Sequence, residues 1–274
     1  MSPAEKEKAL VEWLQAYRGV VVAFSGGVDS TYLAFTAHRV LGERCLAVTG
    51  LSPSMSRRQR EFVDDVVHRL GLRHRFITTD EVADPRYVAN PSNRCYFCKS
   101  ELLRRLEAIR SEEDADVVLD GGNADDLTDH RPGREAGREY GVCSPLAELG
   151  MGKTDIRERS RFWGLPTWDL PATPCLASRF PYGVAVTPKR LSQVERAEEV
   201  LRSMGFREFR VRHHEDLARL EISAEEMPRI LSLEVLQQVN RELRRLGYRF
   251  VTLDLGGFRS GSLNDLLQLE LGGR

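Results

Sequence analysis

Residues 20–30 constrain the fold of this chain more than any other stretch. They begin as an apolar run rich in valine, typical of a buried strand, and break into Ser-Gly-Gly-Val-Asp-Ser before apolar residues recur at helical spacing over 31–40. A strand, a glycine turn and a helix N-terminus form an anion site, because several backbone N–H groups can approach a phosphate and the helix dipole favours negative charge. Ser25 and Ser30 can add hydroxyl donors, and Asp29 can hold Mg²⁺ or cap the helix. The alternative is a plain glycine turn between core elements.

The composition is that of a soluble globular protein, with 274 residues, 41% hydrophobic and 30% charged, enough for one large domain or two smaller ones. A formal net charge of −1 offers no basic field for nucleic acid or an anionic membrane, so neither is an expected partner. We find no long apolar span and no signal peptide. Five irregularly spaced cysteines do not suit a secreted disulfide framework, so a cytoplasmic location is expected.

Strand and helix patterns alternate along the first part of the chain. Further strands are expected over 45–49, 75–78 and 116–120, with helices over 57–70 and 101–109. The alternation predicts an α/β fold with a doubly wound, Rossmann-like parallel sheet, in which ligands lie beyond the carboxyl ends of the strands. Because a stretch rich in Pro, Gly, Thr and Ser ends near residue 187, we predict one domain over 1–187 and a smaller α+β domain over 188–274.

Cys95 and Cys98 form a CxxC pair, and Cys175 lies far downstream in a Pro-Cys-Leu-Ala-Ser-Arg segment. One CxxC has too few ligands for a closed zinc site, and the residues before it do not favour a thioredoxin-like redox pair. Three thiolates would leave one iron of a [4Fe–4S] cluster open to sulfide or substrate, which is one interpretation of these residues. The other is that they are buried small hydrophobes, the interpretation we give to Cys45 and Cys143.

A second role for Cys175 is that of a nucleophile. Arg179 follows four residues later, and a neighbouring guanidinium favours the reactive thiolate. A structural cysteine in a proline-bounded turn is the alternative.

Two strand-borne arginines form a candidate anion-binding face. Arg210 and Arg212 alternate along an expected strand, so both guanidiniums project from one face and suit carboxylate or phosphate recognition. Arg219 and Glu221 share the same parity on the next strand and could extend that face. A solvated face with cross-strand ion pairs is the alternative.

Polar residues also follow the strand expected over 116–120. Asn123, Asp125 and Asp126 come directly after its carboxyl end. Carboxylates there could bind Mg²⁺ beside the phosphates of a nucleotide, and Asn and Asp also serve well as helix N-caps. The two roles are compatible.

Eight motifs, in order, resemble those of one family. They are SGGVDS from Ser25, NRCYFCK from Asn93, DGGNADD from Asp120, RPG from Arg131, SPLAELGMGKTDIR from Ser144, PCLASRFPYG from Pro174, FRVRHH from Phe209 and ARLEI from Ala218. Over about residues 5–265 the chain is similar to the LarE-type ATP-dependent sulfur transferases of the adenine nucleotide alpha hydrolase, or PP-loop ATP pyrophosphatase, superfamily. SGGVDS alone would identify only the superfamily.

The resemblance implies a role in building the nickel-pincer nucleotide cofactor of lactate racemase. Such an enzyme uses ATP and Mg²⁺ to adenylate a carboxylate of pyridinium-3,5-biscarboxylic acid mononucleotide, releases pyrophosphate and then inserts sulfur. In one branch of the family a cysteine at the position of Cys175 gives up its own sulfur. In the other branch three cysteines hold a [4Fe–4S] cluster that carries an added sulfide. The presence of Cys95 and Cys98 beside Cys175 favours the cluster branch, with sulfide or another sulfur donor as a partner.

The resemblance also implies residue roles. Pyrophosphate would be held by Ser25, Gly26, Gly27, Asp29 and Ser30, Mg²⁺ by Asp29 and Asp126 with Asn123 beside them, and adenosine by Ala23, Phe24 and Leu51. Arg210 and Arg212 match phosphate- or substrate-binding positions, and Glu221 matches a nearby acidic position. A homo-oligomer such as a hexamer is expected. The rival functions are a tRNA thiolase of the same superfamily, an ammonia-using synthetase, and a regulatory module that binds a nucleotide without turning it over.

Overall fold

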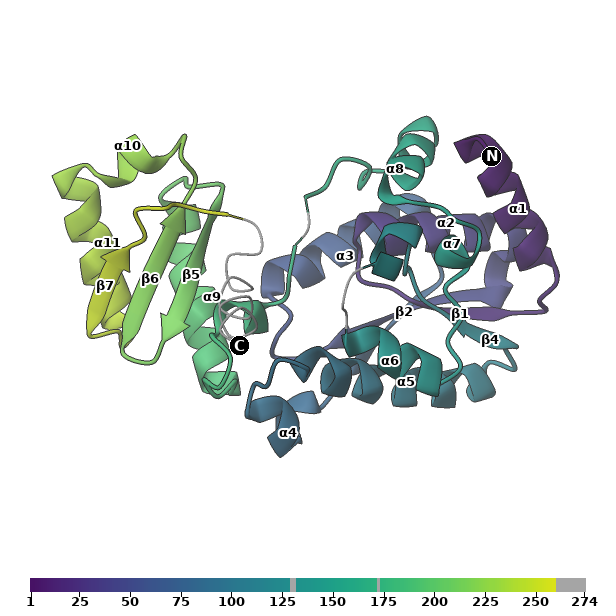
Figure 1. Cartoon of the computed structure of the whole chain (residues 1–274), viewed down its shortest axis with the longest axis horizontal. Coiled ribbons are helices and arrows are strands. Elements are labelled where there is room, and N and C mark those ends of the chain that lie inside the picture. The colour runs from purple at the N-terminus through teal and green to yellow at the C-terminus, as the bar shows by residue number, and fades with distance from the viewer. Residues whose placement is uncertain (129–131, 172, 260–274) are drawn as a thin grey trace, which may run out of the picture. The chain divides into compact units, whose positions relative to one another are not determined.

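The computed structural model describes residues 1–128, 132–171 and 173–259, which belong to two compact units (Figure 1). The first unit consists of Met1–Tyr87 and Ser92–Pro174, and the second of Val88–Pro91 and the chain from Cys175 onward. Arg131, which begins one of the resemblance motifs, lies outside the described residues.

A four-stranded parallel sheet lies at the centre of the first unit and confirms the predicted α/β class. Its strand order is β3-β2-β1-β4. Val20 pairs with Cys45 on one side and with Val117 on the other, so three strands start level and their carboxyl ends share one edge. The strands are β1 (Val20–Ala23), β2 (Cys45–Leu51), β3 (His74–Thr78) and β4 (Val117–Leu119).

Helices cover both faces of this sheet, because β1 is apolar on both sides. Val20 and Val22 pack into a core cluster with α1, α2, α3 and α8, whereas Val21 packs into a second cluster with α5 and α6 (Figure 1). Among the described residues no helix is both long and apolar enough to cross a membrane. The helices are α1 (Pro3–Gln15), α2 (Val28–Leu41), α3 (Arg57–Leu70), α4 (Pro85–Val88), α5 (Arg94–Glu112), α6 (Pro132–Glu139), α7 (Pro145–Glu148) and α8 (Lys153–Phe162).

Helix α5 starts well before residue 101, where the sequence predicted it to start. It begins at Arg94, immediately after Pro-Ser-Asn, and Tyr96 N donates to Asn93 O at 2.9 Å as the first turn forms. The predicted boundary was wrong because the apolar spacing of the helix becomes clear only after its first turn. Both cysteines of the CxxC pair are therefore helical.

The second unit contains a small antiparallel-and-parallel sheet of order β5-β6-β7, packed on helices, which confirms the predicted smaller α+β part. The chain re-enters this unit at Cys175, and the turn after that residue is tied to α9, where Glu198 accepts from Arg179 Nε at 2.8 Å. Its elements are the 3₁₀ turn η4 (Leu176–Arg179), α9 (Pro188–Ser203), β5 (Phe209–His214), β6 (Leu217–Ile222), α10 (Met227–Ile230), α11 (Leu233–Arg245) and β7 (Phe250–Leu253).

Candidate functional site

The glycine loop between β1 and α2 leads into a helix whose N-terminus has no side-chain cap. Ser25 Oγ and Ser30 Oγ lie 3.1 Å apart and close the loop, while Gly27 at the N-cap of α2 supplies no side-chain cap. Gly26 has φ +74°, and a Cβ there would lie 2.9 Å from Val63 Cγ2. The position therefore requires glycine both for its backbone conformation and for the close approach of α3. The first N–H groups of α2 are available to an anion.

Asp29, Asn123 and Asp126 meet at the carboxyl edge of the sheet. Asp29 Oδ2 accepts from Asn123 Nδ2 at 3.3 Å, and Asp126 Oδ2 accepts from Asn123 N at 3.2 Å. Within the described part of the chain, Asp29 Oδ1 is buried and has no hydrogen-bond partner. A buried carboxylate oxygen without a partner is costly unless a ligand satisfies it, so it marks a place for a cation.

Lys153 joins this cluster, although the sequence had suggested no role for it. Its Nζ lies 2.5 Å from Asp29 Oδ2, and its backbone N donates to Asp125 Oδ2 at 2.7 Å as α8 begins. The residue before it, Gly152, packs so closely on Asp125 that a Cβ would lie 2.8 Å from Oδ1. The signal that could have revealed Lys153 is its position at the start of a helix directly after a Gly-Met-Gly segment.

The three residues assigned to adenosine lie at the ends of β1 and β2. Phe24 is buried, its N donates to Val48 O at 2.8 Å, and its carbonyl accepts from Thr49 Oγ1 at 2.8 Å. Leu51 ends β2 half-buried, and its carbonyl accepts from Thr79 N at 2.9 Å. Ala23 is half-buried at the end of β1. The backbone polar groups of Phe24 and Leu51 are thus largely used within the sheet.

The CxxC pair occupies the first turn of α5. Cys95 is exposed and Cys98 is half-buried, and a spacing of three residues puts them on the same side of the helix. Each residue between them is held by a neighbour. Tyr96 Oη donates to Glu139 Oε2 of α6 at 2.6 Å, and the guanidinium of Arg86 lies 4.8 Å from the centre of the Phe97 ring.

The two cysteines predicted to be packing residues behave differently from the CxxC pair. Cys45 is only 2% exposed in β2, and burial raises the pKa of its thiol to about 12. Cys143 is half-buried and packs against the core, and its backbone forms an isolated parallel β-bridge with Leu119 at the end of β4. Burial also raises the pKa of the Cys143 thiol, so neither cysteine resembles a reactive one.

In the second unit, Cys175 is the N-cap of the short turn η4 and is exposed. Its carbonyl accepts from Arg179 Nη1 at 3.0 Å and from Ser178 Oγ at 2.7 Å. Arg179 is itself 4% exposed and bonded to Glu198 of α9 through Nε and Nη2. The exposed thiol therefore stands on a turn that is rigidly anchored to α9.

The arginine strand contacts the same turn. Arg212 Nη1 donates to Ser178 O at 2.9 Å, and Nη2 donates to Glu221 Oε2 at 2.8 Å. Glu221 is fully buried and also accepts from Arg219 of its own strand at 3.0 Å, so the cross-strand ion pair of Arg212 with Glu221 is buried, not solvated. The structure thus brings Cys175 and Arg212 to one place through Ser178.

Arg210 is the guanidinium of this cluster that has most to gain from an anion. Its Nη1 donates to the carbonyl of Phe209 at 2.8 Å, and its guanidinium lies 4.8 Å from the ring centre of Phe258. Burial, followed by the charges of Arg179 and Arg212, lowers the pKa of Arg210 to about 10, against the attraction of nearby carboxylates. A phosphate or carboxylate beside it would relieve that cost.

The predicted site residues thus fall in both units. The glycine loop, Asn123, Asp126 and the CxxC pair lie in the first, whereas Cys175 and the arginine strand lie in the second. In the described ranges, no three His, Cys, Asp or Glu side chains are gathered as ligands for one metal ion. The convergence of the three thiols stays a prediction.

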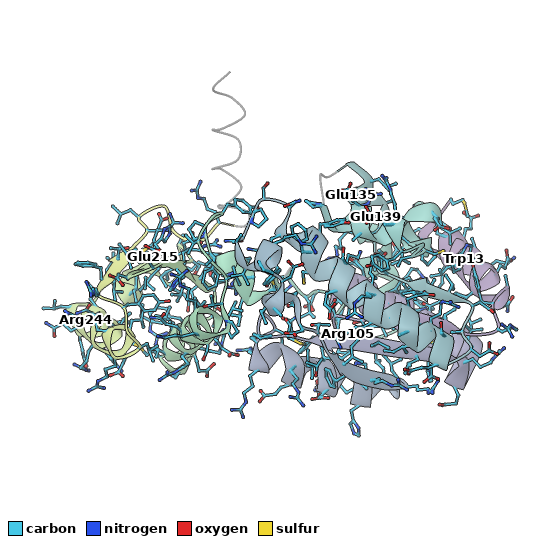
Figure 2. The ribbon with its side chains drawn as sticks, turned by 90° about the horizontal axis from the view of Figure 1, so that it is seen from below. Trp13, Arg105, Glu135, Glu139, Glu215 and Arg244 are labelled. Carbon is cyan, nitrogen blue, oxygen red and sulfur yellow. The ribbon has the colours of Figure 1, made fainter. Side chains whose placement is uncertain are left out.

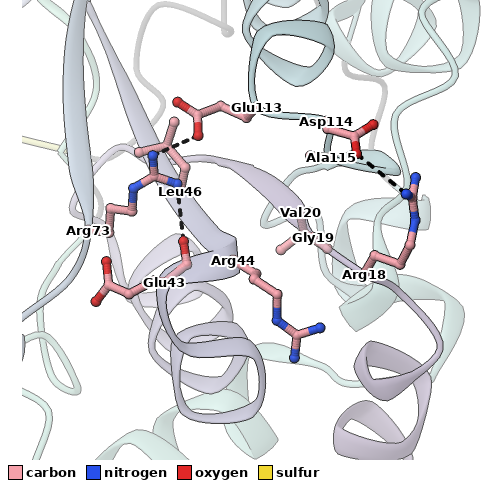
Figure 3. A pocket seen from close by; sticks show the side chains of 10 residues that line it. All are labelled: Arg18, Gly19, Val20, Glu43, Arg44, Leu46, Arg73, Glu113, Asp114 and Ala115. Atoms are coloured by element: carbon pink, nitrogen blue, oxygen red, sulfur yellow. Dashed lines mark hydrogen bonds and ion pairs between the residues drawn. The ribbon is translucent and has the colours of Figure 1, made fainter.

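A pocket of about 310 Å³ lies at the other edge of the first unit's sheet (Figure 3). Val20 and Leu46, at the amino ends of β1 and β2, line it, whereas the glycine loop follows a carboxyl end. Two pairs of opposite charges lie within it. Arg73 lies 2.6 Å from Glu113, and Arg18 lies 3.4 Å from Asp114. This pocket is therefore distinct from the candidate site.

Comparisons with known proteins show what this chain is similar to along its length. No family model matches the chain. The uncharacterized protein slr1717 of Synechocystis sp. is 44% identical over 247 residues, 90% of this chain and 92% of that protein. The pyridinium-3,5-bisthiocarboxylic acid mononucleotide synthase of Lactiplantibacillus plantarum is 38% identical over 265 residues, 96% of this chain and 95% of the synthase. A subunit of the glutamine-hydrolyzing GMP synthase of Methanopyrus kandleri is 27% identical over 198 residues, 67% of this chain and 62% of that protein. This chain is 38% identical to the mononucleotide synthase along nearly the whole of both proteins. It therefore belongs to the LarE family of pyridinium-3,5-bisthiocarboxylic acid mononucleotide synthases, within the PP-loop ATP pyrophosphatase superfamily.

Proposed function

We propose that this protein uses ATP to adenylate a carboxylate of pyridinium-3,5-biscarboxylic acid mononucleotide and then replaces an oxygen of the activated carboxyl group with sulfur, a step in maturing the nickel-pincer cofactor of lactate racemase. The proposal rests on family membership and on one structural observation. Asp29 Oδ1 is buried without a partner in the described part of the chain, beside a glycine loop whose helix N-terminus has no side-chain cap.

The roles of the first unit follow from this loop. Ser25, Gly26, Gly27 and Ser30 would bind the β- and γ-phosphates of ATP through N–H and O–H donors. Asp29 and Asp126, with Asn123 between them, present the hard oxygen ligands that suit Mg²⁺. When bound there, Mg²⁺ would neutralise charge that builds up on the phosphates. The ends of β1 and β2, at Ala23, Phe24 and Leu51, would flank the adenosine.

Activation is needed because a carboxylate resists attack by nucleophiles. A carboxylate oxygen of the substrate attacks the α-phosphorus of ATP, the bond to the β-phosphate oxygen breaks, and pyrophosphate leaves. The mixed anhydride that results has AMP as a good leaving group. The loop N–H groups and Lys153 would stabilise the negative charge that moves onto pyrophosphate.

The substrate's own anionic groups fit the second unit. Arg210 is a half-buried guanidinium, and Arg212 is 5% exposed with its partner Glu221 fully buried. A phosphate or a second carboxylate beside Arg210 would gain charge-assisted hydrogen bonds in a site of low polarity. Glu221 would keep Arg212 and Arg219 in place while the ligand binds.

The sulfur source that we favour is a cluster held by Cys95, Cys98 and Cys175. Two thiols one helical turn apart and one exposed thiol fit the three protein ligands that such a group needs. A [4Fe–4S] cluster bound there would supply, at its open iron, the added sulfide that is transferred.

Cys175 alone is the alternative donor. Its thiolate would attack the carbonyl of the acyl-adenylate, and AMP would leave to give a thioester. Removal of the Cα proton of Cys175 would then break its Cβ–S bond, leaving dehydroalanine in the chain and a thiocarboxylate on the substrate. No CxxC pair is needed for this route.

Pyrophosphate release tests the first half of the proposal. Release should require both ATP and the pyridinium dicarboxylate mononucleotide. Release with no dependence on the carboxylate, or none at all, would instead support a module that binds nucleotide without turning it over. A salt-sensitive complex with tRNA would favour the tRNA thiolase, and full activity after all three cysteines are changed to alanine would favour an ammonia-using synthetase.

Anaerobic purification tests the sulfur source. Iron and sulfide assays with visible absorption should detect a cluster that is lost in Cys95→Ala, Cys98→Ala and Cys175→Ala. Two results together would establish the sacrificial route. Wild-type protein would contain no iron, and of the three substitutions only Cys175→Ala would abolish sulfur transfer. A homo-oligomer is part of the same proposal, and light scattering on the purified protein would measure it.

A further inference from the structure

Lys99 joins the CxxC helix to the end of β4. It follows Cys98 directly, and its Nζ forms an ion pair with Asp120 Oδ2. Asp120 is 8% exposed, and its other oxygen accepts from Ser144 Oγ at 2.6 Å and from Gly122 N at 3.1 Å. Burial opposes ionisation of Asp120, but the Lys99 charge and these hydrogen bonds prevail and lower the pKa of the carboxyl group.

Asp120 in turn adjoins residues 25–30, which we call the phosphate loop after their proposed role. The next residue, Gly121, lies so close to α2 that a Cβ would be 2.9 Å from Ser30 N and 3.1 Å from Ser30 Cα. The end of β4 therefore rests on the last residue of the loop. A short path through Lys99, Asp120 and Gly121 connects the CxxC turn to the loop, and all of it lies within the first unit.

Lys99 links the first turn of α5 to the end of β4, whereas Tyr96 holds the turn to α6. Asn93 at its N-cap makes no side-chain capping bond, and the turn has no acidic residue to favour the helix dipole. A helix start of this kind frays readily unless tertiary contacts hold it.

Helix α6 encloses the stem of Lys99. A Cβ at Gly133 would lie 3.3 Å from Lys99 Cδ, and one at Gly137 would lie 3.9 Å from Lys99 Nζ. Figure 2 shows α6, with Glu135 and Glu139, beside the helix that carries Arg105. The glycines of α6 thus leave room for the lysine side chain.

We infer that Lys99 is a positioning residue that holds the Cys95–Cys98 turn in register with the phosphate loop, so that sulfur transfer follows carboxylate activation. The inference rests on the proposed function, because it assigns the CxxC pair to sulfur delivery. Lys99 acts through Asp120, and its ammonium is already paired with that carboxylate. Its removal would release the helix start without altering the loop itself.

The test compares four variants of the anaerobically purified full chain. Lys99→Met removes the positive charge of the ion pair. The double variant, which adds Asp120→Asn, removes the whole pair and leaves no buried charge. Lys99→Arg is the conservative variant. Arg105→Met, which breaks a 2.5 Å bond to Glu101 further along the same helix, is the matched control. Three quantities are measured: pyrophosphate release, thiocarboxylate formed per pyrophosphate, and the rate at which iodoacetamide labels Cys95, followed by peptide mass spectrometry.

We expect thiocarboxylate per pyrophosphate to fall about tenfold or more in Lys99→Met and in the double variant, since a small misplacement of reacting groups has effects of that size. Pyrophosphate release should stay within about twofold of wild type, Cys95 labelling should accelerate, and Lys99→Arg should restore most of the yield. An equal fall in pyrophosphate release and transfer, or an unchanged yield in the folded double variant, would overturn the inference. If wild type releases no pyrophosphate, the proposed function fails. The role of Lys99 is then tested separately by the labelling rate of Cys95, and a rate that Lys99→Met leaves unchanged would overturn that role.

Discussion

Lys153 Nζ lies 2.5 Å from Asp29 Oδ2, so the first residue of α8 neutralises the aspartate of the phosphate loop. The other oxygen of Asp29 is buried and has no partner in the described part of the chain. On the proposed function, Lys153 would hold the loop ready for ATP, and its side chain, 42% exposed, would turn to the phosphates once Mg²⁺ occupied the carboxylate.

Lys153→Met should raise the KM for ATP by about 10- to 100-fold, the equivalent of one hydrogen bond to a charged group. The reason is that the variant loses both the ion pair with Asp29 and a contact with the phosphates of ATP. Pyrophosphate release at varied ATP measures the change. Arg157→Met on the same helix, whose guanidinium bonds the carbonyls of Trp168 and Leu170, is the control and should leave KM unchanged. Equal KM values in the two variants would contradict the role of Lys153.

Gly26→Ala tests the geometry of the loop. A Cβ at Gly26 meets Val63 Cγ2 at 2.9 Å and the backbone has φ +74°, so the loop must shift. We expect ATP binding to weaken about tenfold or more, with a stability cost of about 1–2 kcal/mol. Gly42→Ala has a similar φ of +58° but nothing within 4 Å of its Cβ. Calorimetry of both variants with ATP and Mg²⁺ separates strain from loss of the site, and a loss of binding in Gly42→Ala as large as in Gly26→Ala would refute this account.

The sheet could be predicted because its signals are local. The valine run, the glycine loop and the alternating patterns of residues 20–120 each depend on neighbours in sequence, and parallel pairing follows from their alternation. The start of α5 was missed because its first turn lacks apolar spacing. Boundaries of this kind are set by tertiary contacts such as those of Tyr96 with Glu139.

The partners of the site residues could not be predicted in the same way. Lys153 and Asp29 are 124 residues apart, and Lys99 and Asp120 are joined only because α5 packs against the sheet that β4 borders. Likewise, the bond from Arg212 to the turn of Cys175 depends on how η4 folds onto β5. The residue types at these positions were visible in the sequence, but the pairing of charges over such distances requires the fold.

Glu7 should make the stability of the first unit depend on acid pH. It is 7% exposed, and it accepts from Arg159 at 2.6 Å, from Trp163 at 2.9 Å and from Tyr32 at 3.0 Å. Burial tends to raise the pKa of Glu7, but these donors prevail and lower the pKa below its ordinary value of 4.5. A lowered folded-state pKa means that the stabilisation is complete above pH 4.5 and is lost as the pH falls through the folded value.

Glu7→Gln should therefore destabilise the protein by about 2–3 kcal/mol at neutral pH, because the half-buried Arg159 loses its counter-charge. The difference from wild type should shrink as the pH falls below 4.5. Urea unfolding at several pH values measures it. Glu12→Gln, on the same helix and in an exposed pair with Lys8, should stay within about 0.5 kcal/mol of wild type. A deficit for Glu7→Gln that is independent of pH would show that its charge is not the cause.

Arg210 should show a trade between stability and substrate binding. Burial and the charges of Arg179 and Arg212 lower the pKa of Arg210 to about 10, so the folded protein bears the cost of a charge that lacks an anion. For a base with a lowered pKa this cost is complete at every pH below the folded value, about 10, and it disappears only at higher pH. The cost should therefore be constant across the neutral range.

Arg210→Met should consequently raise the melting temperature by about 2–4 °C and raise the KM for the mononucleotide by about 10- to 100-fold. The gain in melting temperature should be the same at about pH 6 and pH 8, because the guanidinium is charged at both. Arg207→Met, which removes an exposed arginine just before β5, is the matched control and should change neither quantity. If Arg210→Met melts at a lower temperature than wild type and keeps its KM, this guanidinium stabilises the sheet and is not a binding site for an anion. Scanning calorimetry together with initial rates of pyrophosphate release distinguishes the two results, since only an anion site predicts opposite effects on stability and on substrate affinity.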